Sequence, residues 1–241
     1  MNLEPMIKQI ILVTDGESNI GGNPVEAARG ARAKNITVNT IGIMSQRNQQ
    51  EKPFDEIINI AAAGGGNYEL AYIEDLSRTI QSISYKTVST TIQEVVGKQL
   101  QQILGKGLNE MAPEARSSIL DYIDTYSDEI SLCCCLLLDC SGSMITKIQS
   151  ARHNIIDLLN SLKGRRGSFK IALMGFSSEI AGSCQLLHGF EENIQQLERN
   201  LYRLQPKGGT PTAAALLQAI DLVEEYSRSL RNPLELSEFA G

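Results

Sequence analysis

The chain lacks several features that would assign it to particular classes of protein. Its longest unbroken apolar run, Leu132–Leu138, is far shorter than the roughly 20 residues that a membrane helix needs. Near the N-terminus only Ile10–Val13 is apolar, and no small-residue cleavage signature follows, so we expect a cytoplasmic protein. The net charge is −6, from 22 basic and 28 acidic residues without a long basic run. This balance argues against a protein that holds a nucleic-acid backbone.

The five cysteines are too few and too clustered for a disulfide scaffold. Four of them lie in or just after one apolar run: Cys133, Cys134, Cys135 and Cys140. A metal site built on them is disfavoured, because alternate strand residues face opposite sides of a sheet, no CxxC pair exists and the chain has two histidines. We therefore interpret them as reduced thiols in a buried strand.

Short β-rich apolar runs alternate with amphipathic segments on both sides of a central stretch. The predicted strands are 8–14, 36–43, 67–71, 132–139, 168–176 and 179–186. The predicted helices are 24–34, 53–63, 74–84, 147–162, 191–204 and 212–228, with irregular chain from residue 229. Asn23 is the predicted cap of the first helix, with Pro24 at its first position. This alternation predicts an α/β fold with three layers, in which helices cover both faces of a doubly wound, mostly parallel, six-stranded sheet.

The central stretch has a different pattern. Residues 86–128 carry a helical apolar periodicity that Gly105, Gly107 and Pro113 interrupt, which predicts a helical hairpin. We expect residues 1–85 and 132–241 to be the two halves of one domain, with residues 86–131 as a helical linker. The apolar stripes of this linker suit either a contact with the sheet's helices or a homodimer contact, and the sequence leaves both open.

Three polar loops follow or flank the predicted strands. They are Asp139-Cys140-Ser141-Gly142-Ser143, Thr14-Asp15-Gly16-Glu17 and Gly208-Gly209-Thr210-Pro211-Thr212. One carboxylate and two hydroxyls on a single turn suit a small hard cation such as Mg²⁺, which takes six oxygens at about 2.1 Å. If the strands that end at Val13 and Leu138 are neighbours, the loops of Asp15 and Asp139 meet in the crevice at their carboxyl ends.

The segments LLLDCSGSM (136–144), GGTPT (208–212) and ILVTDGES (11–18) resemble the three parts of the metal-ion-dependent adhesion site of von Willebrand factor type A domains. The resemblance implies a site for Mg²⁺ or Mn²⁺, with Ca²⁺ as a further candidate. Its five implied ligand positions are Asp139, Ser141, Ser143, Thr210 and Asp15. It also implies a partner protein that presents an acidic side chain to the open coordination position of the ion. The expected contact residues are Gly142, Met144, Gly16, Glu17 and Gly209.

The chain order departs from that family. There the DxSxS segment comes first, the threonine loop second and the TDG segment third, whereas here TDG opens the chain. One copy of each segment and six strands without duplication favour a single circularly permuted domain. The alternative is a swapped dimer, in which residues 1–85 complete a neighbouring copy.

The resemblance implies a binding module, and the residues argue against an enzyme. The serine loop lacks the glycine two positions before a serine that a nucleophile elbow requires. No P-loop and no GxGxxG after a strand is present. A metal-assisted hydrolase and a structural assembly domain remain the alternatives. No nucleic-acid partner and no membrane span are expected.

Overall fold

The computed structural model describes residues 6–44, 55–127, 129–161, 166–180, 183–190 and 194–231. Within these residues one sheet has the order β3-β2-β1-β4-β5-β6. Its strands are β1 (Met6–Thr14), β2 (Thr37–Met44), β3 (Gly65–Tyr72), β4 (Ser131–Asp139), β5 (Phe169–Phe176) and β6 (Cys184–His188). All neighbouring strands are parallel except β5 and β6. The predicted mostly parallel sheet of six strands is confirmed.

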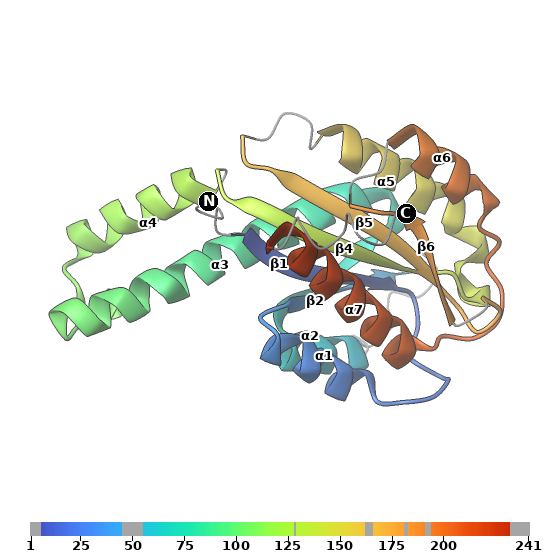
Figure 1. Cartoon of the computed structure of the whole chain (residues 1–241), viewed down its shortest axis with the longest axis horizontal. Helices are drawn as coiled ribbons and strands as arrows, with labels where there is room; N and C mark the ends of the chain where they lie inside the picture. Colours follow the sequence, from blue (N-terminus) through green and yellow to red (C-terminus); the bar gives the residue numbers. More distant parts are fainter. Residues whose placement is uncertain are drawn as a thin grey trace.

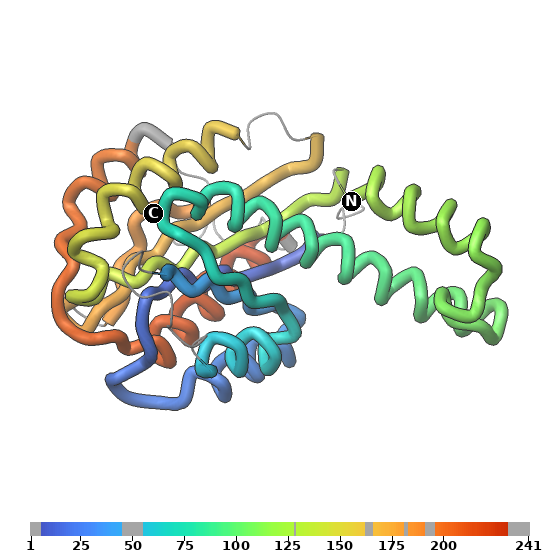
Figure 2. Tube along the Cα trace, turned by 180° about the vertical axis from the view of Figure 1, so that it is seen from behind, coloured from blue at the N-terminus to red at the C-terminus, as the bar shows by residue number. Residues whose placement is uncertain are grey.

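Helices cover both faces of this sheet (Figures 1 and 2). They are α1 (Pro24–Ala33), α2 (Asp55–Ala63), α3 (Leu76–Leu104), α4 (Pro113–Ser127), α5 (Ile148–Ser161), α6 (Ile194–Arg203) and α7 (Thr212–Arg231). Three short 3-10 turns are η1 (Ile73–Asp75), η2 (Leu108–Glu110) and η3 (Gly142–Thr146). One core cluster joins the sheet to α1, α2 and α7, and the other joins it to α3, α5 and α6. The three-layer architecture therefore follows from two separate apolar cores.

The central strands contribute side chains to both cores. Ile11 and Val13 of β1 lie in the core beneath α3 and α5, whereas Ile10 and Leu12 lie in the core beneath α1 and α7. Successive side chains of a strand point to opposite faces, so a strand buried on both faces is apolar throughout. This explains the unbroken apolar runs that the sequence shows in β1 and β4.

The start of α1 is as the sequence predicts. The side-chain oxygen of Asn23 accepts hydrogen bonds from the N–H groups of Val25 (2.9 Å) and Glu26 (3.4 Å), and Pro24 follows it at the first helical position. An N-cap of this kind satisfies backbone donors that have no partner inside the helix.

The helix predicted to end near Ser84 continues to Leu104, so the structure has no break at the expected linker boundary of residues 85 and 86. Its first turns are anchored in the core, and its later turns project from the sheet beside α4 as the predicted hairpin (Figures 1 and 2). Gly105 ends the helix in the left-handed conformation (φ 68°), and its N–H donates to Gln101 O at 3.1 Å. The helix-breaking residues thus mark the tip of the hairpin and not its base.

Other element boundaries also differ from the expectation. β6 begins at Cys184, because the chain around Ser177–Ile180 forms a turn that Ser183 closes by donating its N–H to Ile180 O at 2.8 Å. β3 begins at Gly65 instead of Asn67, and α7 runs to Arg231, past the predicted end. Five predicted segments lie partly outside the described residues. They are the helices 53–63, 147–162 and 191–204, the strand 179–186 and the chain end. None of the described helices combines the length and apolarity needed to cross a membrane.

All five cysteines are buried free thiols, which agrees with the interpretation from the sequence. Burial raises the pKa of Cys133, Cys140 and Cys184 to about 12. We expect none of the five to react with an aromatic disulfide reagent at pH 8, because the thiolate is the attacking species and stays unpopulated until far higher pH. The same assay in denaturant should count five thiols. Rapid modification of the folded protein would contradict the buried positions.

Candidate functional site

The two acidic loops leave the sheet side by side. β1 and β4 are parallel neighbours, and their register pairs Val13 with Leu138. Asp15 directly follows β1, and Asp139 is the last residue of β4. The neighbouring strands that the sequence analysis required are therefore present, at the carboxyl edge of the sheet where ligands of α/β proteins bind.

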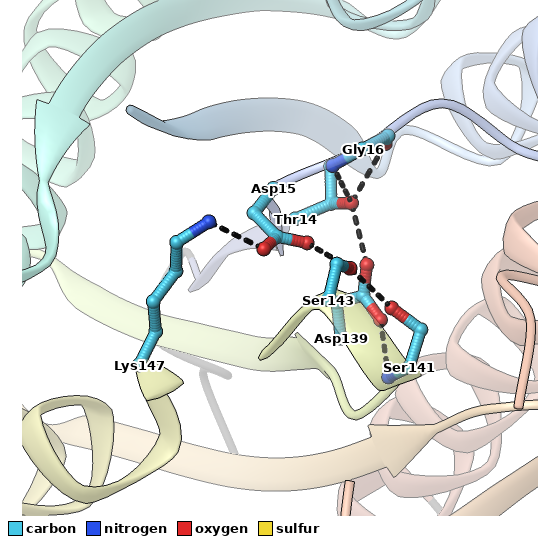
Figure 3. A network of polar contacts seen from close by, with 7 residues as sticks. All are labelled: Thr14, Asp15, Gly16, Asp139, Ser141, Ser143 and Lys147. Atoms are coloured by element: carbon cyan, nitrogen blue, oxygen red, sulfur yellow. Dashed lines mark hydrogen bonds and ion pairs between the residues drawn. The ribbon is translucent and has the colours of Figure 1, made fainter. Parts of the chain in front are cut away.

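Asp139 is fully buried at this edge. Its Oδ2 accepts a hydrogen bond from the hydroxyl of Thr14 at 2.7 Å, and its Oδ1 accepts one from the N–H of Ser141 at 2.7 Å (Figure 3). Burial raises the pKa of the Asp139 carboxyl, these hydrogen bonds partly offset the rise, and the negative charge of Asp15 adds to it. Partners on both oxygens fix the orientation of the carboxylate.

The two serines of the loop extend this network to the second carboxylate. Ser141 Oγ lies 3.0 Å from Ser143 Oγ, and Ser143 donates its hydroxyl proton to Asp15 Oδ1 at 2.6 Å (Figure 3). A serine hydroxyl carries one proton. Because Ser143 gives its proton to Asp15, any hydrogen bond between the two serines is donated by Ser141. Both hydroxyl oxygens keep lone pairs for a further ligand.

Lys147 completes the network at its other end. Its ammonium nitrogen lies 2.5 Å from Asp15 Oδ2, with 16% of the lysine side chain and 0% of the aspartate side chain exposed. The preceding turn η3 positions Lys147, whose N–H donates to Met144 O at 2.9 Å. This lysine is not among the site residues predicted from the sequence. Its position at the start of the predicted helix 147–162, just after the DxSxS loop, is the signal that could have found it.

The threonine loop is held against the other two loops through its backbone. The N–H of Thr210 donates to Asn19 Oδ1 at 2.8 Å, and the N–H of Asn19 donates to Thr210 O at 3.2 Å. The N–H of Gly142 donates to Gly208 O at 2.9 Å. Thr210 is buried between them. Within the described part of the chain, no hydrogen bond joins its hydroxyl to Asp139, Ser141 or Ser143, so the structure brings the three loops together but leaves Thr210 outside the network.

The expected partner-binding residues are placed unequally. Glu17 is exposed, and Gly16, Gly142 and Gly209 are partly exposed. Met144 was expected on this surface, and this is wrong: the residue is 0% exposed and lies in the core cluster beneath α3 and α5. The turn η3 directs Met144 inward and leaves its neighbour Ile145 60% exposed.

Three further residues support the loops, and of these the sequence analysis missed Glu56. Thr14 and Asn19 make the contacts described above, and Glu56 of α2 accepts a hydrogen bond from the N–H of Ser18 at 2.6 Å. Burial raises the pKa of Glu56, the Ser18 N–H lowers it, and the charge of Glu17 raises it. Thr14 is the first residue of the TDG segment and Asn19 follows that segment closely, but nothing in the sequence links Glu56 to it.

The donor set fits a divalent cation that prefers oxygen. In an octahedron with bonds of about 2.1 Å, adjacent ligand atoms lie about 3 Å apart. The two serine oxygens are 3.0 Å apart, and the fixed carboxylate of Asp139 lies beside them. No group of three or more His, Cys, Asp or Glu residues that could hold a metal occurs among the described residues. An ion here would therefore rest largely on neutral hydroxyls.

Comparisons with known proteins agree with this architecture. Two family models described as von Willebrand factor type A domain match residues 4–86 and 134–233. The protein YabS of Bacillus subtilis (strain 168) is 35% identical over 230 residues, covering 95% of this chain and 93% of that protein. YwmC of the same strain is 40% identical over 67 residues, or 28% of each chain.

A solved structure shows the same fold. The crystal structure of an uncharacterized protein from Alicyclobacillus acidocaldarius matches with a TM-score of 0.81 and 36% sequence identity. The match covers 93% of this chain and 97% of that chain. With family matches on both sides of the hairpin and a fold shared over nearly the whole chain, this protein belongs to the von Willebrand factor type A domain family.

Proposed function

We propose that this domain binds a partner protein through a divalent ion, Mg²⁺ or Mn²⁺, held at the end of β1 and β4. Domains of this family are generally protein-interaction modules. The observation that carries the proposal is the continuous polar network from Asp139, through the N–H and hydroxyl of Ser141 and the hydroxyl of Ser143, to Asp15 (Figure 3). It gathers hard oxygen donors on one turn, as small divalent cations require.

The residues of this network take different roles in the proposal. Asp139 provides a charged ligand, and Ser141 and Ser143 provide neutral ones. Asp15 and Thr210 act directly or through water. The bound ion supplies the strongest local positive charge of the site, and an acidic side chain of the partner takes its open position. The exposed side chains of Glu17, Ile20 and Ile145 form the surrounding contact surface.

We further propose that the site serves binding and not catalysis. A nucleophilic serine would need an adjacent group that accepts its proton. The hydroxyl of Ser143 does donate to Asp15, but Lys147 neutralises that carboxylate. With Oδ1 taken by Ser143 and Oδ2 by Lys147, this carboxylate is held in an ion pair and is not placed as a general base.

The chain order is proposed to be a circular permutation of the family's usual order, with the two halves of one domain joined by α3 and α4. In support, strands from before the hairpin (β1 to β3) and after it (β4 to β6) meet in one sheet through the pairing of β1 with β4. The boundary between the first half and the linker falls within α3, so this helix belongs to both.

The partner proposal predicts a chelator-sensitive interaction. Immobilised protein in Mg²⁺ buffer should retain partners that excess EDTA releases, because the ion bridges the two surfaces. Thr210→Ala should lower this retention, and the matched Thr125→Ala substitution on exposed α4 should not. Replacing the critical acidic residue of a captured partner should weaken binding at least about tenfold, the scale of a lost charged contact. Equal affinity in EDTA, or no effect of any acidic residue, would contradict the proposal.

A further inference from the structure

The ion pair of Lys147 with Asp15 changes the electrostatics of the site. The aspartate side chain is fully buried, and the lysine is largely so. Charges removed from water in this way are screened only weakly by salt and interact more strongly than exposed pairs. The ammonium of Lys147 is therefore a positive charge held on Asp15, the carboxylate that accepts the Ser143 hydroxyl.

Both oxygens of Asp15 are engaged. Oδ1 accepts from Ser143 at 2.6 Å, and Oδ2 accepts from Lys147 at 2.5 Å. A direct bond from Asp15 to an ion would compete with one of these contacts. In the observed arrangement Asp15 orients the Ser143 hydroxyl, and Lys147 cancels the charge that Asp15 would otherwise contribute.

We propose that Lys147 is a positioning residue that sets the net charge of the ion site and so selects an anionic partner group. The inference rests on the proposed function. Asp139 and Asp15 alone would neutralise a divalent ion, and a partner carboxylate would then make the site negative. With Lys147 the loaded site keeps one positive charge, which a single partner carboxylate neutralises.

The backbone of Lys147 can be kept while its charge is removed. Its N–H bonds to Met144 O at 2.9 Å, and its carbonyl accepts from Ala151 N at 3.0 Å at the start of α5. Neither contact uses the side chain. Lys147→Gln keeps a hydrogen-bond donor on a shorter side chain, and Lys147→Arg keeps the charge. Lys86→Gln removes the same charge from α3, where Lys86 pairs with Glu69 of β3.

The test is a Mn²⁺ titration of variants of the whole chain. Electron paramagnetic resonance measures the free Mn²⁺ at each step. Lys147→Gln should bind Mn²⁺ at least about tenfold more tightly than the parent, because a cation repelling the ion has been removed. Lys147→Arg and Lys86→Gln should stay within about threefold of the parent. The direction of the change is decisive, since a merely structural role of Lys147 would make binding weaker on substitution. Unchanged or weaker binding by Lys147→Gln would overturn the inference.

Acetate tests the preference for anions. When acetate displaces a water from protein-bound Mn²⁺, the relaxation rate of the water protons falls, which reports acetate binding. The acetate affinity of Lys147→Gln should be at least about fivefold lower than that of the parent, because a positive charge has been removed. An equal acetate affinity would overturn the selective role of Lys147. If the proposed ion site itself is wrong, the result differs: the parent then binds Mn²⁺ no better than Asp139→Ala does. If neither the parent nor Lys147→Gln binds Mn²⁺, both proposals are overturned.

Discussion

The Asp139→Ala protein should bind Mg²⁺ or Mn²⁺ at least about a hundredfold more weakly than the parent, so that calorimetry detects no binding. Loss of a residue that only supports a metal ligand already costs about 10–100-fold in affinity. Asp139 would ligate directly and is the one carboxylate of the network without a lysine partner. The remaining donors, Ser141 and Ser143, are neutral.

Asp139→Asn separates the loss of charge from a loss of folding. The alanine leaves the Ser141 N–H without its buried acceptor, at a cost of about 1–3 kcal/mol, and the Thr14 hydroxyl loses its bond to Asp139. An asparagine can accept from Ser141 and donate to Thr14, whose own proton can go to Gly16 O, 2.9 Å away. Asp139→Asn should therefore fold and still lose most of the ion affinity.

Asp121→Ala on the exposed face of α4 is the matched control and should bind like the parent. Thermal unfolding followed by circular dichroism would show that each variant is folded before its titration. Undiminished ion binding by both Asp139 variants would rule out this site.

A chain reclosed from Gly241 to Met1 by a short linker and reopened near Leu108 should fold as a monomer with the ion affinity of the parent. Leu108 lies at the tip of the hairpin in η2, where the surrounding residues are exposed. Opening the chain there leaves the β1–β4 pairing and both cores intact. Sizing with light scattering gives the mass, and a Mn²⁺ titration tests the site.

This experiment distinguishes a permuted domain from a swapped dimer. In a swapped dimer, β1 of one copy would pair with β4 of another, and the reclosed chain would assemble only as a dimer with its halves in different subunits. The reclosed chain carrying Asp139→Asn is the control for ion binding, since it should fold equally well and lose the ion.

Local patterns in the sequence determined the architecture and part of the site. Unbroken apolar runs predicted β1 and β4, because strands covered on both faces have no polar side. The cap at Asn23 and the bond from Ser141 N–H to Asp139 each span two residues, so the local sequence contains both partners. The DxSxS and TDG segments located the site for the same reason, since each is one short turn at the end of a strand.

Tertiary structure alone decided how these parts meet. The bonds from Thr14 to Asp139 and from Lys147 to Asp15 join residues 125 and 132 positions apart, and only the register of β1 against β4 brings them together. The turn η3 directs Met144 inward, where it packs in the core beneath α3 and α5, and a loop sequence does not reveal this direction.

Helix α3 shows the same limit. Its propensities allow a helix past residue 84, but its place on the sheet depends on a buried polar network. Gln9 donates to Ser84 at 2.9 Å and accepts from Asn39 at 3.0 Å, and Thr87 donates to Asn39 at 3.0 Å. Buried polar groups need partners, and these partners come from three elements far apart in the chain. The sequence therefore determined which segments form strands, helices and oxygen-rich loops, and tertiary packing decided which polar side chains pair.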